Sequence, residues 1–369
     1  MYIFAIAFLS TFAILDVFNK EFLEKYKMIF VFSCFIFLVF HDGFRWETGT
    51  DWIPYNTFFE GLTIKYGIDD SEFDIGYVLL NYVIRILTDS YTIYLVIYAV
   101  SFYLLFFFSI FKLSKLPFVS LLLFYMITVP YLGMNRQFIS MALFSVGLVF
   151  LTKNKKMYFL LIILLGLFFH KTILLGLLAL FVNKKIPNKI LLSLLIVVIL
   201  MSLTGIINYL SLGAFVFLGN DIEKKMDFYT LNADNINIIF TILAFIRKFI
   251  WIAILLIFDK KIENKPPHYY MFFNLYFIGS CMYILFNGTI FQIFVSRALL
   301  YYNLMEIFLI PYVLTLLRPN YGKLIVMFIL VAYCYINIEK GFSNYGPNTD
   351  YFEPYKGIFI NSDYGRQYQ

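Results

Sequence analysis

Residues 28–40 read MIFVFSCFIFLVF, and after the link HDG, residues 44–55 read FRWETGTDWIPY. The first stretch is uninterrupted apolar sequence, which is typical of a helix in a lipid bilayer. The second places an arginine, a glutamate and an aspartate among two tryptophans, a tyrosine, a glycine and a proline. Charged side chains are costly at membrane depth and usually mark a functional site or an ion pair. The two stretches together predict a membrane helix that ends at a functional polar loop.

The whole chain has the composition of a membrane protein. Of its 369 residues, 62% are hydrophobic and only 14% are charged. Soluble domains are roughly half apolar and a quarter charged. Apolar runs of roughly 16 to 26 residues recur along the chain without polar alternation, which predicts helices and not a closed barrel. We therefore expect an all-α polytopic membrane protein.

Lysine-rich connectors predict how the chain is threaded. The positive-inside rule places all of them in the cytoplasm. They are KEFLEKYK at 20–27, KLSK at 112–115, KNKK at 153–156, NKKIPNK at 183–189, DKKIENK at 259–265 and RPNYGK at 318–323. About ten full transmembrane helices satisfy this constraint. We expect them near 2–18, 28–42, 91–111, 118–134, 137–152, 190–212, 237–258, 269–288, 297–317 and 324–339.

Two segments do not fit as single crossings. Residues 157–182 lie between two basic connectors, so we expect a short hairpin with its tip near His170–Lys171 at the outer face. Residues 76–88 are short, and we expect a re-entrant or interfacial helix there. Both termini are then outside. The prediction is one transmembrane domain, 1–339, with outer loops 43–75 and 213–236 and a periplasmic tail, 340–369.

This threading brings unusual polar residues from separate segments to the outer face. They are Arg45, Glu47, Asp51, Asn135, Arg136, Gln137, His170, Lys171 and Arg297. Several guanidinium groups suit a phosphate or diphosphate, whose oxygens they hold in a fixed fork. The chain has no nucleotide-binding, metalloprotease or serine-hydrolase motif, which argues against nucleotide-driven chemistry. Ordinary roles remain open: an arginine can snorkel, a histidine can pack in the core, and Asp51 can cap a helix or pair with Arg45.

Four of these segments resemble one family. RWETGTDWIPY resembles the R-[YW]-x-x-G-T-D-[YW] signature of EpsG-like proteins, a branch of the Wzy-type O-antigen and exopolysaccharide polymerases. NRQFISMALF is similar to the R-Q segment of that family, LGLFFHKTILL to its F-H-[KS]-[ST] segment, and SRALLYYN to its later arginine. Lys171 departs from the small residues that also occur after the histidine, which leaves the role of that position open.

The resemblance implies a polysaccharide polymerase of GT-C-like architecture, active at the periplasmic face of the bacterial inner membrane. It would transfer a growing glycan from undecaprenyl diphosphate to the non-reducing end of a lipid-linked repeat unit. A carrier-lipid ligase or another transferase and a flippase are the alternatives. We expect no metal or other cofactor and no nucleic acid, with lipid-linked donor and acceptor as partners and a chain-length regulator as a further candidate.

The expected chemistry assigns roles to the polar residues. Guanidinium groups can stabilise a diphosphate leaving group without protonating it, and a carboxylate or imidazole can orient or deprotonate the attacking hydroxyl. The candidate catalytic residues are Asp51, Glu47 and His170. The candidate diphosphate ligands are Arg45, Arg136, Arg297, Lys171 and Gln137. The candidate sugar-binding residues are Trp46, Trp52 and Tyr55, although the tryptophans are also typical interface anchors.

Overall fold

The computed structural model describes residues 1–62, 73–204, 206–207, 238–259, 265–266, 268–287, 289, 297–317, 320–343, 345 and 350–366. Within these ranges the regular elements are helices, which confirms the all-α prediction, and no strand occurs. The chain divides into two compact units, which are described separately. Unit 1 comprises Met1–Leu177 and Ile310–Gln369, and unit 2 comprises Leu178–Leu309. The predicted outer loop 213–236 and the middle of loop 43–75 lie outside the described residues.

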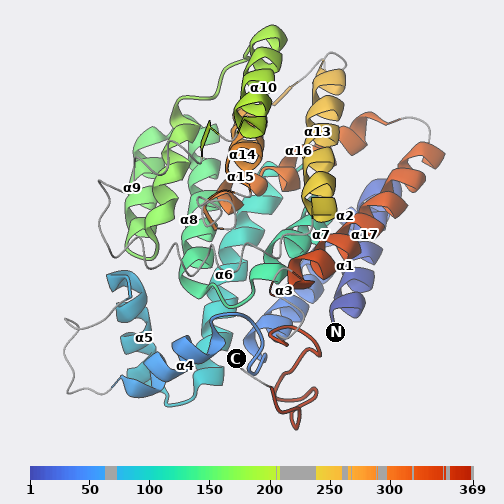
Figure 1. The fold of residues 1–369 in the computed structure, drawn as a ribbon. Helices are drawn as coiled ribbons and strands as arrows, with labels where there is room; N and C mark the ends of the chain where they lie inside the picture. The colour runs from blue at the N-terminus through green and yellow to red at the C-terminus, as the bar shows by residue number, and fades with distance from the viewer. Residues whose placement is uncertain are drawn as a thin grey trace. The chain divides into compact units, whose positions relative to one another are not determined.

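Unit 1 is built from apolar helices, and two of them, α4 and α5, lie at one end (Figure 1). Its helices are α1 (Tyr2–Phe18), α2 (Lys20–Lys25), α3 (Lys27–Gly43), α4 (Trp52–Gly61), α5 (Ile75–Leu87), α6 (Tyr91–Leu113), α7 (Pro117–Thr128), η2 (Val129–Tyr131), α8 (Asn135–Thr152), α9 (Lys156–Leu167) and α17 (Asn320–Ser343). The 3-10 helix η3 (Lys171–Leu180) begins in this unit. Helix α1 packs against α7 and α17, α6 packs against α3 and α8, and α8 packs against α9.

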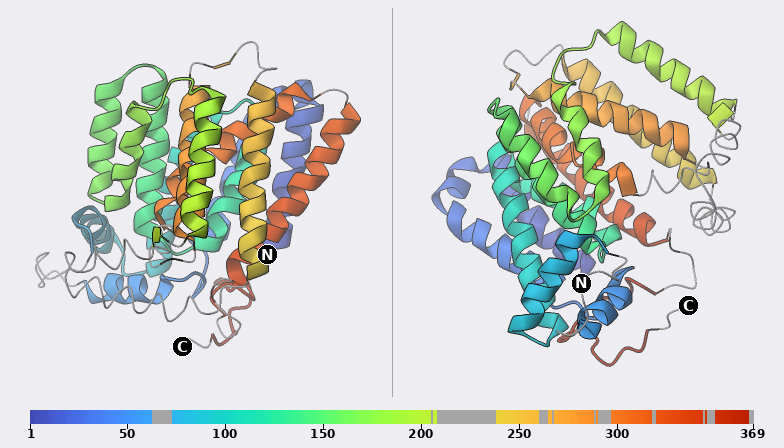
Figure 2. Two further views of the ribbon diagram at one scale, coloured as in Figure 1. Left: turned by 45° about the horizontal axis from the view of Figure 1, so that its top comes forward. Right: turned by 90° about the vertical axis from the view of Figure 1, so that its left-hand side faces the viewer.

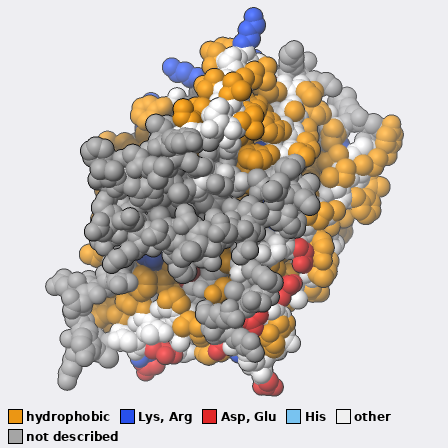
Figure 3. Space-filling model, in the orientation of Figure 1, with side chains coloured by type: hydrophobic (Ala, Val, Ile, Leu, Met, Phe, Trp, Pro, Cys, Tyr) orange, Lys and Arg blue, Asp and Glu red, His pale blue; other side chains and the backbone are white. Residues whose placement is uncertain are grey.

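Local sequence explains where several helices begin. Asn19 caps α2 by accepting a hydrogen bond from the Phe22 backbone N–H at 3.2 Å. Ser90 caps α6 in the same way, and α7 starts with a proline, whose missing N–H is not needed in a first turn. Helix α7 is buried all round, whereas α1, α3, α9 and α17 expose many large apolar side chains. In Figure 3 apolar side chains cover much of the visible described surface, as expected for contact with lipid.

One end of unit 1 carries its basic connectors. Asp16 lies in a cavity of about 390 Å³ that Lys20, Lys115 and Lys323 also line. Lysines from three separate connectors therefore meet at one end, as the predicted threading requires. The N-terminus, α4, α5 and the tail lie at the other end, where α4 runs across the bundle (Figure 2). Acidic side chains gather at this end in Figure 3.

The two irregular segments of unit 1 have the expected form. Helix α9 and η3 are two short helices joined by a corner at residues 168–170, as predicted for the hairpin. Helix α5 buries Tyr77, Asn81 and Ile84. Its exposed large side chains form an apolar stripe, namely Ile75, Leu79, Val83, Ile86 and Leu87. An apolar stripe on a short helix fits the predicted interfacial placement.

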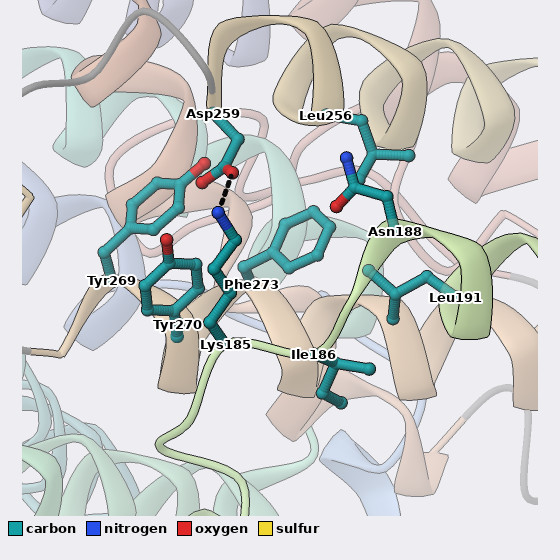
Figure 4. A pocket seen from close by; sticks show the side chains of 9 residues that line it. All are labelled: Lys185, Ile186, Asn188, Leu191, Leu256, Asp259, Tyr269, Tyr270 and Phe273. Carbon is teal, nitrogen blue, oxygen red and sulfur yellow. Dashed lines mark ion pairs between the residues drawn. The ribbon is translucent and has the colours of Figure 1, made fainter.

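Unit 2 contains α10 (Asn188–Leu203), α13 (Ile238–Asp259), α14 (Tyr269–Phe286), α15 (Leu300–Asn303) and the start of α16 (Glu306–Leu316). Helix α14 packs against α10, α13 and α15. At one end Asp259 accepts ion pairs from Lys185 at 3.5 Å and Lys265 at 2.7 Å, and Figure 4 shows the first of these beside Tyr269 and Tyr270. Lys185, Asp259 and Lys265 therefore lie together at one end of unit 2.

Some elements differ from the predicted spans. The single span expected at 297–317 is broken into α15 and α16. Lys248 is buried in unit 2 and forms an ion pair with Glu306 at 3.0 Å. Among the residues that the structure describes, four helices, α6, α8, α14 and α17, are long and apolar enough to cross a membrane, and several apolar helices are shorter. The count of about ten full spans and the GT-C-like architecture remain predictions.

Candidate functional site

Two glycines, Gly49 in the loop 44–51 and Gly133 in the turn before α8, shape the contact between these two segments. Gly49 has φ +110° and Gly133 has φ +109°, backbone angles that residues other than glycine rarely adopt. A Cβ on Gly49 would lie 2.3 Å from the Leu132 carbonyl oxygen, and the Thr50 N–H donates to that oxygen at 3.1 Å. The G-T-D part of the sequence signature therefore lies directly on the turn before α8.

Arg45 is fully buried beneath this loop. Its Nη1 forms an ion pair with Asp42, three residues earlier at the end of α3. Its Nη2 donates to Asn135 Oδ1 at 2.9 Å. Arg45 thus joins the end of α3 to the start of α8, and its ion-pair partner is Asp42 and not Asp51.

Arg136, the next residue along α8, has a different environment. Its Nη1 contacts Asp74 Oδ2 at 3.0 Å, and its side chain is 21% exposed. Its Nε donates to the Tyr55 hydroxyl at 3.1 Å, and its guanidinium lies 4.8 Å from the centre of the Phe73 ring. A carboxylate, a phenol and an aromatic face fix this guanidinium, while the Arg136 side chain as a whole stays partly exposed.

The corner of the α9–η3 hairpin lies beside the Arg136 group. The Gly76 N–H, two residues after Asp74, donates to the Phe168 carbonyl at 2.8 Å. On α8, Ser140 Oγ donates to the carbonyls of Gly166 at 3.1 Å and His170 at 3.3 Å. These bonds bring the His170–Lys171 dipeptide to the same end of unit 1 as Arg136.

Hydrogen bonds define the tautomer of His170. The Thr172 backbone N–H donates to His170 Nδ1 at 3.3 Å, and the Thr172 hydroxyl lies 2.6 Å from the same nitrogen. A backbone N–H can only donate, so Nδ1 is an acceptor and a neutral imidazole carries its proton on Nε2. His170 therefore presents an N–H donor at Nε2, and the neighbouring Lys171 is exposed.

The other candidates in unit 1 occupy varied positions. Asp51 is half-buried at the N-cap of α4 but makes no side-chain cap hydrogen bond. Glu47 has φ +46° and forms an ion pair with Lys356. Trp52 is buried between Trp46 and Tyr91, in an aromatic cluster that also contains Tyr55. Gln137 is buried in α8.

Arg297 belongs to unit 2 and is half-buried just before α15. The group that shares one end of unit 1 is therefore Arg45, Arg136, His170 and Lys171 with the loop 44–51. Across the described ranges, no three His, Cys, Asp or Glu side chains are arranged to hold a metal ion.

The tail is the part of this site that sequence reasoning missed. Its backbone pairs with the loop, because Trp46 N–H donates to the Lys356 carbonyl at 3.0 Å and Gly49 N–H to the Tyr351 carbonyl at 2.9 Å. The Tyr355 hydroxyl donates to the His41 carbonyl, and burial raises the pKa of Tyr355. The tail therefore packs directly against the loop 44–51.

Two acidic partners were also missed. Asp42 precedes Arg45 by three residues at a helix end, a spacing at which side chains meet. Asp74 was one of many carboxylates in loop 43–75, so its sequence position alone did not single it out.

These features define a class: a helical membrane protein with a cationic, aromatic site where its polar loops meet. The family model of the EpsG family matches residues 27–357. The chain belongs to the EpsG family, as its signature segments predicted. No curated protein and no solved structure matches the chain. Family membership and the apolar helices together indicate a multi-pass membrane protein of the polysaccharide-polymerase type.

Proposed function

We propose that the protein is a polymerase that transfers a growing glycan from undecaprenyl diphosphate to the non-reducing end of a lipid-linked repeat unit. The reaction takes place at the periplasmic face of the bacterial inner membrane. The observation that carries the proposal is the Arg136 group. Its guanidinium is held by Asp74 and Tyr55, the side chain as a whole is 21% exposed, and the group lies at the same end of unit 1 as His170 and Lys171.

The leaving group of this reaction is a diphosphate, which needs stabilisation of negative charge and no proton. A guanidinium fixed in advance provides this without reorganisation during the reaction. Arg136 is the principal diphosphate ligand in our proposal. Lys171 adds a second positive charge, and the Nε2 N–H of neutral His170 adds a hydrogen-bond donor. This donor role for His170 follows from the Thr172 N–H bond to Nδ1.

The attacking sugar hydroxyl needs an acceptor for its proton. Asp51 is our first choice because it is half-buried at the start of α4, one turn before Tyr55, which contacts Arg136. Glu47 is the second choice, and its carboxylate forms an ion pair with Lys356. Trp46 is half-buried beside Trp52 and is the candidate for stacking on a sugar.

Arg45 has a supporting role in this proposal. Its side chain is 1% exposed and its charge is paired with Asp42, so it holds the loop and the start of α8 that positions Arg136. Gln137, buried on α8, supports the same turn. Arg297 remains a candidate diphosphate ligand on the strength of its sequence segment.

Reconstitution tests the activity directly. Purified protein in vesicles that contain undecaprenyl-diphosphate-linked repeat units, without nucleotide, should produce a ladder of longer lipid-linked glycans. Adding lipid A distinguishes a ligase, which would move glycan to lipid A without lengthening it. A ligase pattern, or no ladder from folded protein, would contradict the proposal.

A further inference from the structure

A second cationic centre lies on the tail side of the loop 44–51. Arg366, nine residues beyond the end of the family match at 357, is 9% exposed. Its Nη2 donates to Thr48 Oγ1 at 2.9 Å and to the Pro354 carbonyl at 2.8 Å. Thr48 Oγ1 also donates to the Lys356 carbonyl at 2.8 Å, so Arg366 contacts the centre of the loop–tail junction.

The rest of the Arg366 guanidinium is unused. Its Nε and Nη1 are buried and have no hydrogen-bond partner, which leaves three N–H bonds of a charged group without an acceptor. No carboxylate within the described ranges pairs with it. Glu47 is paired with Lys356, and Asp350 accepts from the Tyr364 hydroxyl at 2.9 Å. Buried charged groups are normally paired, so this arrangement calls for an anion.

Arg366 makes two hydrogen bonds and lies 5.9 Å from the centre of the Tyr364 ring, but none of these contacts supplies an anion or an acceptor for Nε and Nη1. A neutral donor could reach Thr48 and Pro354 equally well, whereas a guanidinium adds a positive charge and further donors. Lys356, 5% exposed, adds a second buried cation, and Glu47 balances only one of the two. The junction therefore contains a buried guanidinium with which no carboxylate of the described residues forms an ion pair, since Glu47 pairs with Lys356 and Asp350 accepts from Tyr364.

We infer that Arg366 is an anion-binding residue, which takes a phosphate or carboxylate oxygen of the lipid-linked glycan through Nε or Nη1. The inference rests on the proposed function, because a polymerase handles two lipid-linked substrates and needs more than one anion contact. Arg136 and Arg366 then both bind anionic groups at the same end of unit 1.

Ligand binding by the purified full-length chain in detergent tests this inference. The probes are farnesyl diphosphate with neutral farnesol, and glucuronate with neutral glucose, so the diphosphate and carboxylate sources are separated. Arg366→Gln should weaken binding of at least one anion by about tenfold or more, the loss of one charge-assisted contact. Arg366→Lys should retain more of the affinity, because it keeps the charge. Arg85→Gln is the control, since Arg85 already has an ion pair with Asp89.

The outcomes are distinct. Equal anion affinities of wild type and Arg366→Gln would overturn the inference. A lower melting temperature with unchanged affinity would also overturn it, because Arg366 would then only stabilise the packing of the tail against the loop. If Arg366→Gln does not fold, hydrogen exchange on the wild type decides. The bound anion should protect backbone amides in 354–366, and no protection would overturn the inference. Failure of the proposed function would appear differently, as the absence of a wild-type ladder.

Discussion

Arg45 and Arg136 lie at the same end of unit 1, and both come from signature segments, but their surroundings differ. Arg45 is buried and its charge is matched by Asp42, with Asn135 as a further partner. Arg136 also pairs with a carboxylate, Asp74, but its side chain is 21% exposed and lies against aromatic rings. A sequence pattern gives both residues the same importance, whereas the structure gives them different environments.

This difference suggests a structural role for Arg45 and a ligand-binding role for Arg136. Arg45 lies in the loop and connects two helices: it pairs with Asp42 at the end of α3 and donates to Asn135 at the start of α8. Arg136 is held by Asp74 and Tyr55, and its side chain remains 21% exposed. We therefore expect substitutions at Arg45 to change mainly stability, and substitutions at Arg136 to change mainly activity.

The largest effect on stability is expected for Arg45→Ala. Removing one member of a buried ion pair leaves the other charge unpaired, which costs about 3–5 kcal/mol. The measurement is the free energy or midpoint of unfolding of the purified protein in detergent. The double variant Asp42→Asn with Arg45→Gln removes both charges and should be clearly more stable than Arg45→Ala. If Arg45→Ala unfolds like the wild type, the supporting role of Arg45 is wrong.

Arg136→Ala should have the largest effect on activity. Loss of one fixed group that stabilises a developing anion typically lowers turnover by about 10²–10³-fold. The initial rate of ladder formation measures it. Arg85→Ala is a close control, because Arg85 also has a carboxylate partner at 3.0 Å, an aromatic ring at 5.3 Å and a side-chain exposure of 23%. Similar rates for the two variants would remove Arg136 from the proposed diphosphate site.

Gly49→Ala tests the contact between the loop and the turn before α8. The substituted residue would have φ +110°, and its Cβ would meet the Leu132 carbonyl at 2.3 Å. We expect a loss of about 1–3 kcal/mol in the free energy of unfolding, because strained backbone carries a cost of this size. Gly61→Ala is the control, since a Cβ there meets nothing within 4 Å. Equal stability of the two variants would contradict this account of the signature glycine.

The smallest effect is expected for Glu47→Gln. The Glu47 side chain is 26% exposed and that of Lys356 is 7% exposed, so this pair is less buried than the Asp42–Arg45 pair but is not a surface pair. We expect a loss of about 1 kcal/mol and a small fall in the melting temperature. Any large loss of ladder formation would then reveal a catalytic role for this carboxylate, whereas unchanged activity would leave Asp51 as the candidate acceptor.

Much of the fold follows from the sequence. Long apolar runs predict helices because the bilayer requires every backbone group to be paired internally. The requirement that Lys-rich connectors share one side also predicts a hairpin at 157–182, where the structure has the two short helices α9 and η3. The break between α15 and α16 was not predicted, because apolar content alone does not distinguish one helix from two.

The site was less predictable because it depends on contacts between distant segments. The signature glycine, the two arginines and the histidine stand out as residue types, and the structure places them at one end of unit 1. Their partners do not stand out. Asp74 becomes informative only when α5 approaches α8, and the tail only when Lys356 and Arg366 meet the loop more than 300 residues earlier in the chain.

The most direct test of the comparison is the ladder-forming activity per folded molecule of Arg45→Ala and Arg136→Ala. Both variants are reconstituted side by side at a temperature at which each is folded. We predict that Arg45→Ala stays within about tenfold of the wild type and that Arg136→Ala falls by at least about 100-fold. The opposite result, with Arg45→Ala inactive and Arg136→Ala active, would contradict the account.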